Sequence, residues 1–309
     1  MMNSTTATTD AATSDAAPTN RPAGHRAGFS WSALPARLGW WLAQAILWLF
    51  MITVVFPMVW TVFSSLKTSP ELFNAPWGLP ASPQWQNYVN AWTKMNAGTF
   101  LFNSVLVSAF ALTSVMMTGA LVAYVLARYP FPSNRIIYFY FIAGMMIPGF
   151  LAYIPAWFLH QSLGLLDTRT GLVIQYTAFF LPFTVFFLHS FFRTLPRELE
   201  EAAIVDGASL YTVFWRIMLP LSKSGLLTIA VFNFLSVWNE FMWALITISR
   251  DEIKTLPLGM ANLQQNAKYA TDWGAMFAGF VIMLIPTFLI YAIFQNRLTE
   301  GITIGAIKG

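Results

Sequence analysis

The run WWLAQAILWLFMITVVFPMVWTVF, residues 40–63, decides the fold because it contains no Asp, Glu, Lys or Arg. A helix needs about 20 consecutive apolar residues to cross about 30 Å of hydrocarbon, and this run is long enough. It is too long for the apolar core of a secretory signal peptide, and it has no small-residue cleavage site. We therefore interpret it as a retained first transmembrane helix.

Five further runs meet the same length test: residues 104–127, 136–159, 172–192, 226–248 and 275–294. The composition agrees, since 57% of the residues are hydrophobic and only 10% are charged, whereas soluble proteins carry about 25% charged residues. This number of charged residues is too small to cover the surface of a protein that is surrounded by water. The sequence predicts an all-α integral membrane protein with six transmembrane helices in one domain, residues 39–309.

Basic residues give the expected orientation of these helices. Six helices place both termini on one side, and with that side cytoplasmic, 11 of the 17 Lys and Arg residues lie inside. The positive-inside rule favours this arrangement in the cell membrane. Residues 1–38, rich in Ser, Thr, Ala and Pro, are predicted to form a disordered cytoplasmic tail. Residues 296–309 are predicted to form a second cytoplasmic tail, whose last nine residues, 301–309, are flexible.

Several functional classes find no support in the sequence. The absence of cysteine excludes disulfides, thiolate metal sites and cysteine nucleophiles. His25, His160 and His189 are scattered, and no catalytic set falls together on the predicted helices. The basic residues form no patch for nucleic acid, and no G-x-x-x-x-G-K-[ST] phosphate loop is present. We expect this chain to have no catalytic residue, metal, bound cofactor or nucleic-acid partner.

One cytoplasmic segment, TLPRELEEAAIVDGASLYTVFWRIMLPLSKSG, residues 194–225, is too long for a simple turn between helices. Pro196 suits a first helical turn, and the acidic residues that follow complement the helix dipole. Gly207 is suited to ending this helix, and Ser209 to capping a second, amphipathic one. The segment therefore predicts two short helices outside the bilayer. An interfacial helix lying on the membrane is the alternative.

The same segment resembles the EAA loop of binding-protein-dependent ABC import permeases. The matching positions are Glu201, Ala202, Ala203, Asp206, Gly207, Ala208, Phe214, Ile217, Leu219 and Pro220. In that family the loop is the coupling helix, which docks in a cleft of a cytoplasmic ATPase subunit. The resemblance implies an ATPase-coupling role for these ten residues. It also implies the type I ABC importer permease fold.

Motifs elsewhere resemble the carbohydrate-uptake branch of that family, the maltose-type (MalG-like) permeases. They include Trp238-Asn239-Glu240-Phe241, Thr255-Leu256-Pro257-Leu258-Gly259, and the C-terminal string of residues 301–309. The resemblance implies an inner-membrane subunit that forms half of the translocation pathway of an ATP-driven sugar importer. Its implied partners are a second permease subunit, two cytoplasmic ATPase subunits and an extracytoplasmic sugar-binding protein. ATP and Mg would be used by the ATPase.

Polar residues in the fifth predicted helix are candidates for the substrate pathway. Glu240 is the one acidic residue inside a predicted span, and charges inside membranes usually face a cavity or a partner. Asn233 and Asn239 lie near it in the sequence and would line the same pathway. The alternative is that Glu240 makes an interhelical hydrogen bond that fixes packing. Prolines at 148, 155, 182 and 286 are expected to interrupt and bend their helices, and a static kink filled by a neighbouring side chain is the alternative.

Two other functions stay open at the level of sequence. An ABC permease for a non-sugar solute shares the same loop pattern. A secondary transporter accounts for the membrane helices and for Glu240, but it gives residues 194–225 no purpose. The particular sugar, direct substrate contact by this subunit, the identity of its partners and the role of the N-terminal tail do not follow from the sequence.

Overall fold

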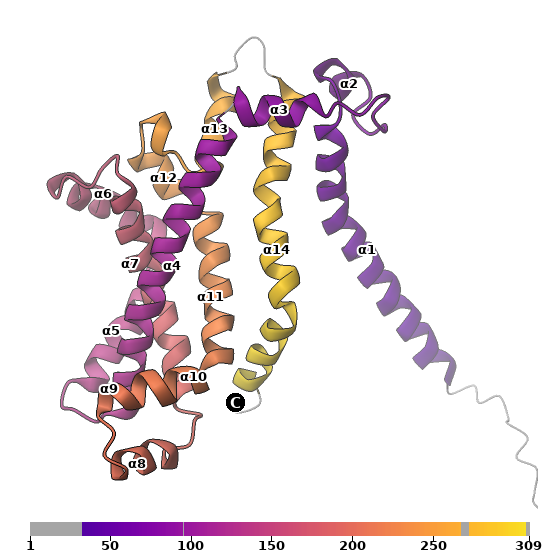
Figure 1. Cartoon of the computed structure of the whole chain (residues 1–309). Helices are drawn as coiled ribbons and strands as arrows, with labels where there is room; N and C mark the ends of the chain where they lie inside the picture. The colour runs from indigo at the N-terminus through magenta and orange to yellow at the C-terminus, as the bar shows by residue number, and fades with distance from the viewer. Residues whose placement is uncertain (1–32, 95, 267–271, 307–309) are drawn as a thin grey trace, which may run out of the picture. The chain divides into compact units, whose positions relative to one another are not determined.

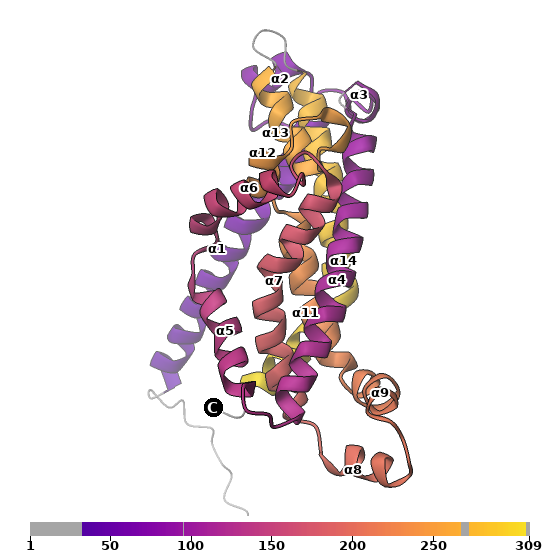
Figure 2. The same ribbon diagram turned by 90° about the vertical axis from the view of Figure 1, so that its left-hand side faces the viewer.

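The computed structural model describes residues 33–94, 96–266 and 272–306, with side chains for 38–94, 96–261 and 272–295. Most of the predicted N-terminal tail, residues 1–32, therefore lies outside the described residues. Every regular element in the described part is a helix (Figures 1 and 2), which agrees with the predicted all-α class.

The principal helices are α1 (Ala33–Ser65), α2 (Ser69–Asn74), α3 (Gln86–Thr93), α4 (Ala97–Arg128), α5 (Asn134–Met146), α6 (Tyr153–Ser162), α7 (Arg169–Phe192), α8 (Glu198–Val205), α9 (Leu210–Val213), α10 (Leu219–Leu221), α11 (Lys223–Trp238), α12 (Met242–Thr247), α13 (Leu256–Asn266) and α14 (Trp273–Ala306). Short 3-10 turns occur at Gly149–Ala152 and Asp251–Ile253, and a π-helical turn at Phe214–Met218.

The chain divides into two compact units, and the division falls inside α1 between Val55 and Phe56. In the first unit the apolar side chains from Leu38 onward are exposed. A helix that is hydrophobic all round and not covered by protein is suited to lipid. This agrees with the interpretation of residues 40–63 as a membrane helix.

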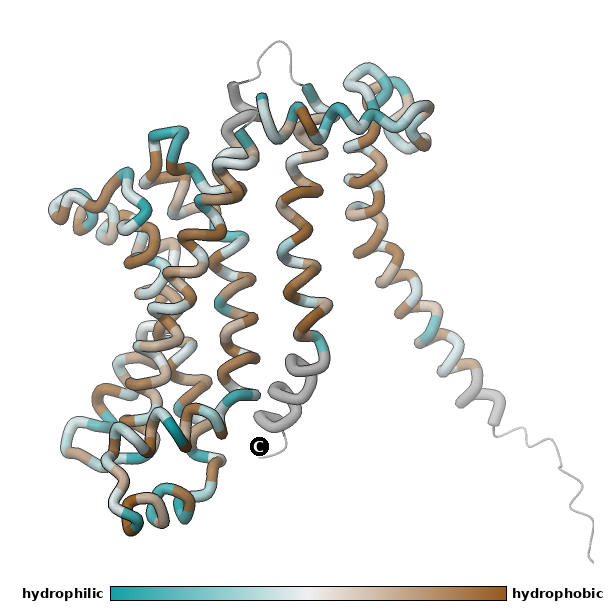
Figure 3. The backbone as a smooth tube through the Cα atoms, viewed as in Figure 1, coloured by the Kyte–Doolittle hydropathy of each residue, from teal (hydrophilic) through white to brown (hydrophobic). Residues whose placement is uncertain are grey.

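Among the described residues, four helices are long and apolar enough to cross a membrane: Leu38–Ser65, Ala97–Arg128, Arg169–Phe192 and Trp273–Gln295. The count rises to six if each of two bent helix pairs is one span. Hydrophobic residues run along the long helices, and hydrophilic residues gather toward their ends (Figure 3). The four continuous helices correspond to the predicted runs 40–63, 104–127, 172–192 and 275–294, and the bent pair Asn134–Met146 and Gly149–Ser162 corresponds to the run 136–159. The other bent pair, Leu210–Leu221 and Lys223–Trp238, includes only the first part of the run 226–248.

The second unit is built around close packing of α4 against α7, with α11 beside both (Figure 2). Gly119 of α4 permits this approach, because a Cβ built there would lie 2.5 Å from Thr184 Cγ2 of α7. The interface holds one core cluster, which contains Ala123, Val185 and Leu188. A second cluster joins the other halves of α4 and α7 to α12.

The predicted interruptions by proline differ from site to site. At Pro148 the helix breaks, and the segments on either side of the break are bent by 98°. Ile147, which precedes this proline, is extended, as expected for a residue before proline. Pro182 and Pro286 instead lie inside the continuous helices α7 and α14, so the expected breaks there are wrong. Neighbouring turns preserve a membrane helix when one hydrogen bond is lost.

The fifth predicted run, 226–248, is also interrupted. Helix α11 ends at Trp238, and α12 begins only at Met242. The last run, 275–294, agrees with the candidate span Trp273–Gln295, and the helix that contains this span, α14, continues to Ala306. Residues 301–306 are therefore helical, whereas the sequence predicted a flexible tail. Residues 307–309 lie outside the described part.

At the end of α4 opposite α8, the segment between α1 and α4 is ordered by buried polar groups. Lys67 is fully buried, and its Nζ donates hydrogen bonds to the carbonyl oxygens of Ala75 (3.0 Å) and Pro76 (3.1 Å). The amide of Asn87 donates to the carbonyl oxygens of Ser65 (2.9 Å) and Lys67 (2.8 Å). These bonds account for the folded α2 and α3 region.

A second polar clamp ties the loop after α6 to the loop after α12. Asp167 accepts hydrogen bonds from the backbone N–H groups of Ser249 (2.9 Å) and Arg250 (3.1 Å) and forms an ion pair with Arg250. Burial raises the pKa of Asp167, but these N–H groups and the Arg250 charge outweigh burial, and the pKa lies below its usual value. The carboxylate therefore stays ionised in the clamp.

Candidate coupling site

The segment 194–225 contains two short helices, α8 and α9, joined by a turn. Gly207 has a φ of +84°, a conformation that glycine adopts without the penalty of a Cβ. The Ser209 hydroxyl accepts a hydrogen bond from the Thr212 N–H at 3.2 Å and caps α9. Both local features match the sequence prediction. The helix after this cap continues as the π-helical turn and α10.

The tip of this segment is exposed. Of the predicted coupling residues, Glu201, Ala202, Asp206 and Gly207 are exposed, and Ala203 and Ala208 are partly buried. Val205 at the end of α8 is 86% exposed. Small residues, two acidic side chains and exposed apolar side chains, of which Val205 is the most exposed, therefore form the surface of the tip.

The base of the segment is buried in the bundle. Phe214 is 4% exposed, and its ring lies 5.0 Å from the ring of Tyr124 in α4. Ile217 and Leu219 pack against the same core cluster, while Pro220 is exposed. The apolar positions in the predicted pattern thus anchor the segment to α4, whereas the acidic and small positions lie at the tip.

A buried ion pair fixes α8 to the end of α4. Arg128 Nε lies 2.7 Å from Glu200 Oε1, and the two side chains are only 3% and 10% exposed. Arg128 also donates to the carbonyl oxygen of Leu195 at 2.8 Å, and the Tyr124 hydroxyl donates to Glu200 at 3.4 Å. Within a low-dielectric interior, such a pair holds its partners in one arrangement.

From the sequence, Arg128 had no role, and Glu200 was only one of the acidic residues expected to complement the dipole of the first short helix. A signal was present, because Arg128 is the one charged residue in the 97–128 run. Burying a single charge at a helix end requires a partner of opposite sign. The acidic residues 198, 200 and 201 were the available candidates, but sequence spacing did not single out Glu200.

The three candidate pathway residues do not share contacts in the described structure. Glu240 follows α11 and accepts hydrogen bonds from the Tyr176 hydroxyl (2.6 Å) and the Trp243 N–H (2.7 Å). Asn233 is buried, and its amide donates to the Thr184 hydroxyl at 2.8 Å. Asn239 is exposed, and its amide donates to the Leu235 carbonyl at 2.8 Å.

These contacts give Glu240 a definite structural role. Its carboxylate satisfies backbone donors at the start of α12 while holding the Tyr176 hydroxyl of α7. The interhelical hydrogen bond considered as an alternative in the sequence analysis is therefore present. It fixes the break between α11 and α12.

The arrangement around α8 suits mechanical transmission. An exposed tip of small side chains is connected to a buried base, and the connection includes an ion pair to a long membrane helix. A force on the tip would reach α4 and α11 without passing through a loose linker. In the described residues no group of three or more His, Cys, Asp or Glu side chains is placed to hold a metal ion.

Comparison with known proteins identifies this architecture. Residues 115–303 match the family model described as "Binding-protein-dependent transport system inner membrane component". The diacetylchitobiose uptake system permease protein NgcG of Streptomyces coelicolor is 40% identical over 86% of this chain and 88% of its own length. The sulfoquinovosyl glycerol transport system permease protein SmoH of Agrobacterium fabrum is 32% identical over 84% of this chain and 90% of its own.

The fold has a match among solved structures as well. A chain in the crystal structure of a bacterial ABC transporter involved in the import of the acidic polysaccharide alginate aligns with a TM-score of 0.77. The alignment covers 87% of this chain and 98% of that one, at 21% identity. The chain belongs to the binding-protein-dependent transport system inner membrane component family, and it is a multi-pass membrane permease subunit of an ABC importer.

Proposed function

We propose that this chain is one of two permease subunits of an ATP-driven sugar importer and that residues 194–225 couple it to a cytoplasmic ATPase. The observation that carries the proposal is the exposed tip of α8 on a buried base. Both termini are then cytoplasmic. The ATPase subunits use ATP and Mg, and this chain supplies half of the translocation pathway.

The surface chemistry of the tip supports docking of a soluble protein. Val205 is 86% exposed at a turn between two short helices, and Tyr211 is 73% exposed nearby in the sequence. Burying a Val side chain contributes roughly 1.5 kcal/mol or more, so a partner that covers this tip gains from contact. Ala202 permits close approach, and the exposed Glu201 and Asp206 offer acceptors to basic or backbone donors of the partner.

The carbohydrate assignment rests on the relatives and on local motifs. The relatives include permeases named for diacetylchitobiose, sulfoquinovosyl glycerol and trehalose. We propose a disaccharide or short oligosaccharide as the substrate, delivered by an extracytoplasmic binding protein. The second permease subunit completes the pathway.

We propose that Asn239 faces this pathway, because its side chain is exposed at the break between α11 and α12. An amide offers both a donor and an acceptor to a sugar hydroxyl. Glu240 and Asn233 then shape the pathway by holding α11 against α7.

Docking is tested by Val205→Asp in the tagged full-length chain, co-expressed with its ATPase. Docking would then bury the new aspartate carboxylate without a partner of opposite charge, which is costly. We therefore expect the amount of co-purified ATPase to fall at least tenfold. Leu79→Asp is the matched control, because Leu79 is 71% exposed in the loop between α2 and α3. Equal ATPase recovery with wild type, Val205→Asp and Leu79→Asp would contradict docking at α8.

A further inference from the structure

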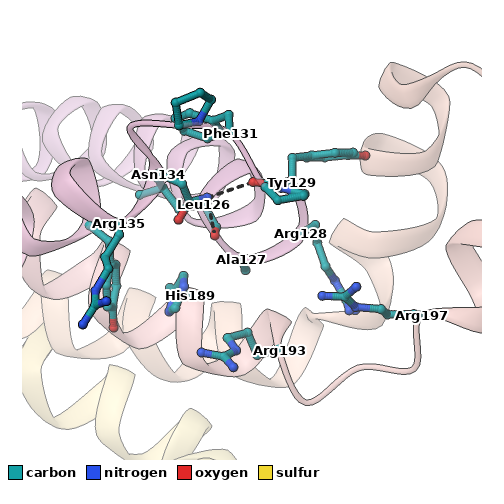
Figure 4. A pocket seen from close by; sticks show the side chains of 13 residues that line it. Leu126, Ala127, Arg128, Tyr129, Phe131, Asn134, Arg135, His189, Arg193 and Arg197 are labelled. Atoms are coloured by element: carbon teal, nitrogen blue, oxygen red, sulfur yellow. Dashed lines mark hydrogen bonds between the residues drawn. The ribbon is translucent and has the colours of Figure 1, made fainter.

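A pocket of about 550 Å³ lies where α4 and α7 end and α5 begins, beside the start of α8. Its lining includes four arginines, Arg128, Arg135, Arg193 and Arg197, and also His189 (Figure 4). No acidic side chain lines the pocket. The site lies away from the α8 tip and from Asn239, so it is not part of the proposed coupling or sugar contacts.

Three of the four arginine charges are not neutralised within the described residues. Arg128 is paired with Glu200. Arg135, Arg193 and Arg197 are exposed, and each lacks a carboxylate within ion-pair distance in the described part of the chain. The pocket therefore presents an excess of positive charge, which favours an anionic ligand.

His189 adds an observation that is independent of the arginines. Its side chain is buried, with 7% exposure for the residue, and it lines the pocket. Its Nδ1 is buried and has no hydrogen-bond partner among the described residues. The ring stacks on Tyr138 at 4.0 Å, which holds its orientation. In Figure 4 the ring lies between the side chains of Arg135 and Arg193.

Imidazole donates a hydrogen bond from whichever ring nitrogen carries a proton, so the ring of His189, which lines the pocket, can contribute a donor to a bound anion. Arginine guanidinium groups bind phosphate oxygens with paired N–H donors. Together these side chains form a phosphate site with one buried donor and several peripheral ones.

The surroundings favour a lipid as the source of the phosphate. The pocket lies at the ends of candidate membrane spans, the depth at which lipid headgroups occur. Next to Arg135, α5 exposes Ile136 (72%), Phe139 (52%) and Tyr140 (75%), an apolar surface suited to acyl chains. Arg135 lies 5.5 Å from the Phe139 ring centroid, a cation–π contact that leaves its N–H groups free to bind.

We propose that this pocket binds the phosphate of an anionic phospholipid headgroup, with His189, Arg135 and Arg193 as principal ligands. Basic pockets between transmembrane helices are established sites for such headgroups. The pocket is lined by Arg128, which is ion-paired with Glu200 of α8, and by Arg197, which directly precedes α8. A bound lipid therefore also braces the base of the coupling segment.

The test measures lipid retention by the purified full-length chain in detergent, using native mass spectrometry with added phosphatidylglycerol or phosphatidylcholine. We expect phosphatidylglycerol to be preferred in wild type. In R135Q/R193Q its affinity should fall more than tenfold, since each arginine near the surface contributes on the order of fivefold. R216Q is the matched control, because Arg216 is an exposed arginine in the π-helical turn after α9 and does not line the pocket. We expect the phosphatidylglycerol affinity of R216Q to stay within twofold of wild type.

His189→Phe separates ligand binding from folding, because Phe preserves stacking on Tyr138 but removes both ring nitrogens. We expect it to weaken phosphatidylglycerol binding severalfold at unchanged thermal stability. Displacement of the lipid by millimolar inorganic phosphate would support the phosphate site with a soluble anion as its source, whereas no displacement would support the lipid. Equal retention of the two lipids by wild type, or equal phosphatidylglycerol affinity in R135Q/R193Q, His189→Phe and R216Q, would overturn the proposal.

Discussion

At the scale of single residues, position 207 requires glycine because of its backbone conformation and not because neighbouring atoms leave no room for a side chain. Its φ of +84° belongs to the left-handed region, yet a Cβ built on it would meet nothing within 4 Å. Alanine there costs about 1–2 kcal/mol of local strain but causes no clash. Proline is incompatible, since its ring holds φ near −65°.

We therefore predict that Gly207→Pro inserts into the membrane but uncouples transport, because only the turn between α8 and α9 is distorted. Gly207→Ala is the matched control and should keep most activity. Binding-protein-stimulated ATPase activity and sugar uptake in reconstituted vesicles are the measurements. Persistence of both activities in Gly207→Pro would count against a coupling role for the segment.

Glu240 is the second residue whose role the contacts define. Its carboxylate accepts hydrogen bonds from the Tyr176 hydroxyl and from the N–H groups of Trp243 and Ala244. Glu240→Ala leaves these donors without a partner, and we expect a loss of about 1–3 kcal/mol in unfolding free energy. Glu240→Gln keeps one acceptor and should lose less, as measured by thermal unfolding in detergent.

The same variants distinguish packing from substrate contact. In complexes that still assemble, we expect Glu240→Gln to leave sugar affinity within about twofold of wild type, since less than 0.5 kcal/mol would be lost from binding. A large fall in sugar affinity at unchanged stability and assembly would instead place the carboxylate against the sugar.

At the scale of elements, hydropathy and local chemistry predicted much of what the structure contains. The runs 40–63, 104–127 and 172–192 lie within α1, α4 and α7, because each run is long and free of charge. The Gly turn and the Ser209 cap were also predictable, since both depend on neighbours in the sequence. Both features depend only on interactions between residues that are close in the sequence, so they can be predicted from one sequence.

Other features were beyond sequence reasoning because they depend on contacts between distant residues. The break after Trp238 is held by Glu240 through a hydrogen bond to Tyr176, 64 positions away. Arg128 and Glu200 meet only after α4 and α8 are placed by the bundle. Among the prolines, the sequence did not distinguish Pro148, where the helix breaks, from Pro182, where it continues.

The Arg128–Glu200 ion pair gives a prediction at the scale of the elements it joins. Removing one partner from a buried pair leaves an uncompensated charge and costs about 3–5 kcal/mol. Arg128→Gln and Glu200→Gln should each destabilise the chain by this amount, and the double variant should lose less than the sum. Chemical unfolding in detergent, arranged as a double-mutant cycle, measures the coupling.

The exposed Arg250–Asp167 pair is the matched control for this cycle, because its side chains are 59% and 31% exposed. Pairs near the surface contribute about 0–1 kcal/mol, so Arg250→Gln should have a small effect. Equal costs for Arg128→Gln and Arg250→Gln would show that burial does not strengthen the link between α4 and α8.

At the scale of the whole molecule, scarce charge is distributed unevenly. Only 10% of the residues are charged, yet residues 198–206 hold four acids, and the adjacent pocket contains four arginines. The long helices that lead away from this region are largely apolar (Figure 3). The charges are therefore concentrated where the chain leaves the membrane.

The orientation of this molecule is testable because the chain contains no cysteine, so any introduced thiol is unique. We predict that a membrane-impermeant maleimide labels Leu79→Cys in intact cells, whereas Val205→Cys reacts only after permeabilisation. Both native side chains are highly exposed, at 71% and 86%, so access differs by membrane side and not by burial. This prediction follows from the positive-inside rule, which favours a cytoplasmic α8. Labelling of Val205→Cys but not Leu79→Cys in intact cells would invert the topology and remove α8 from any cytoplasmic ATPase.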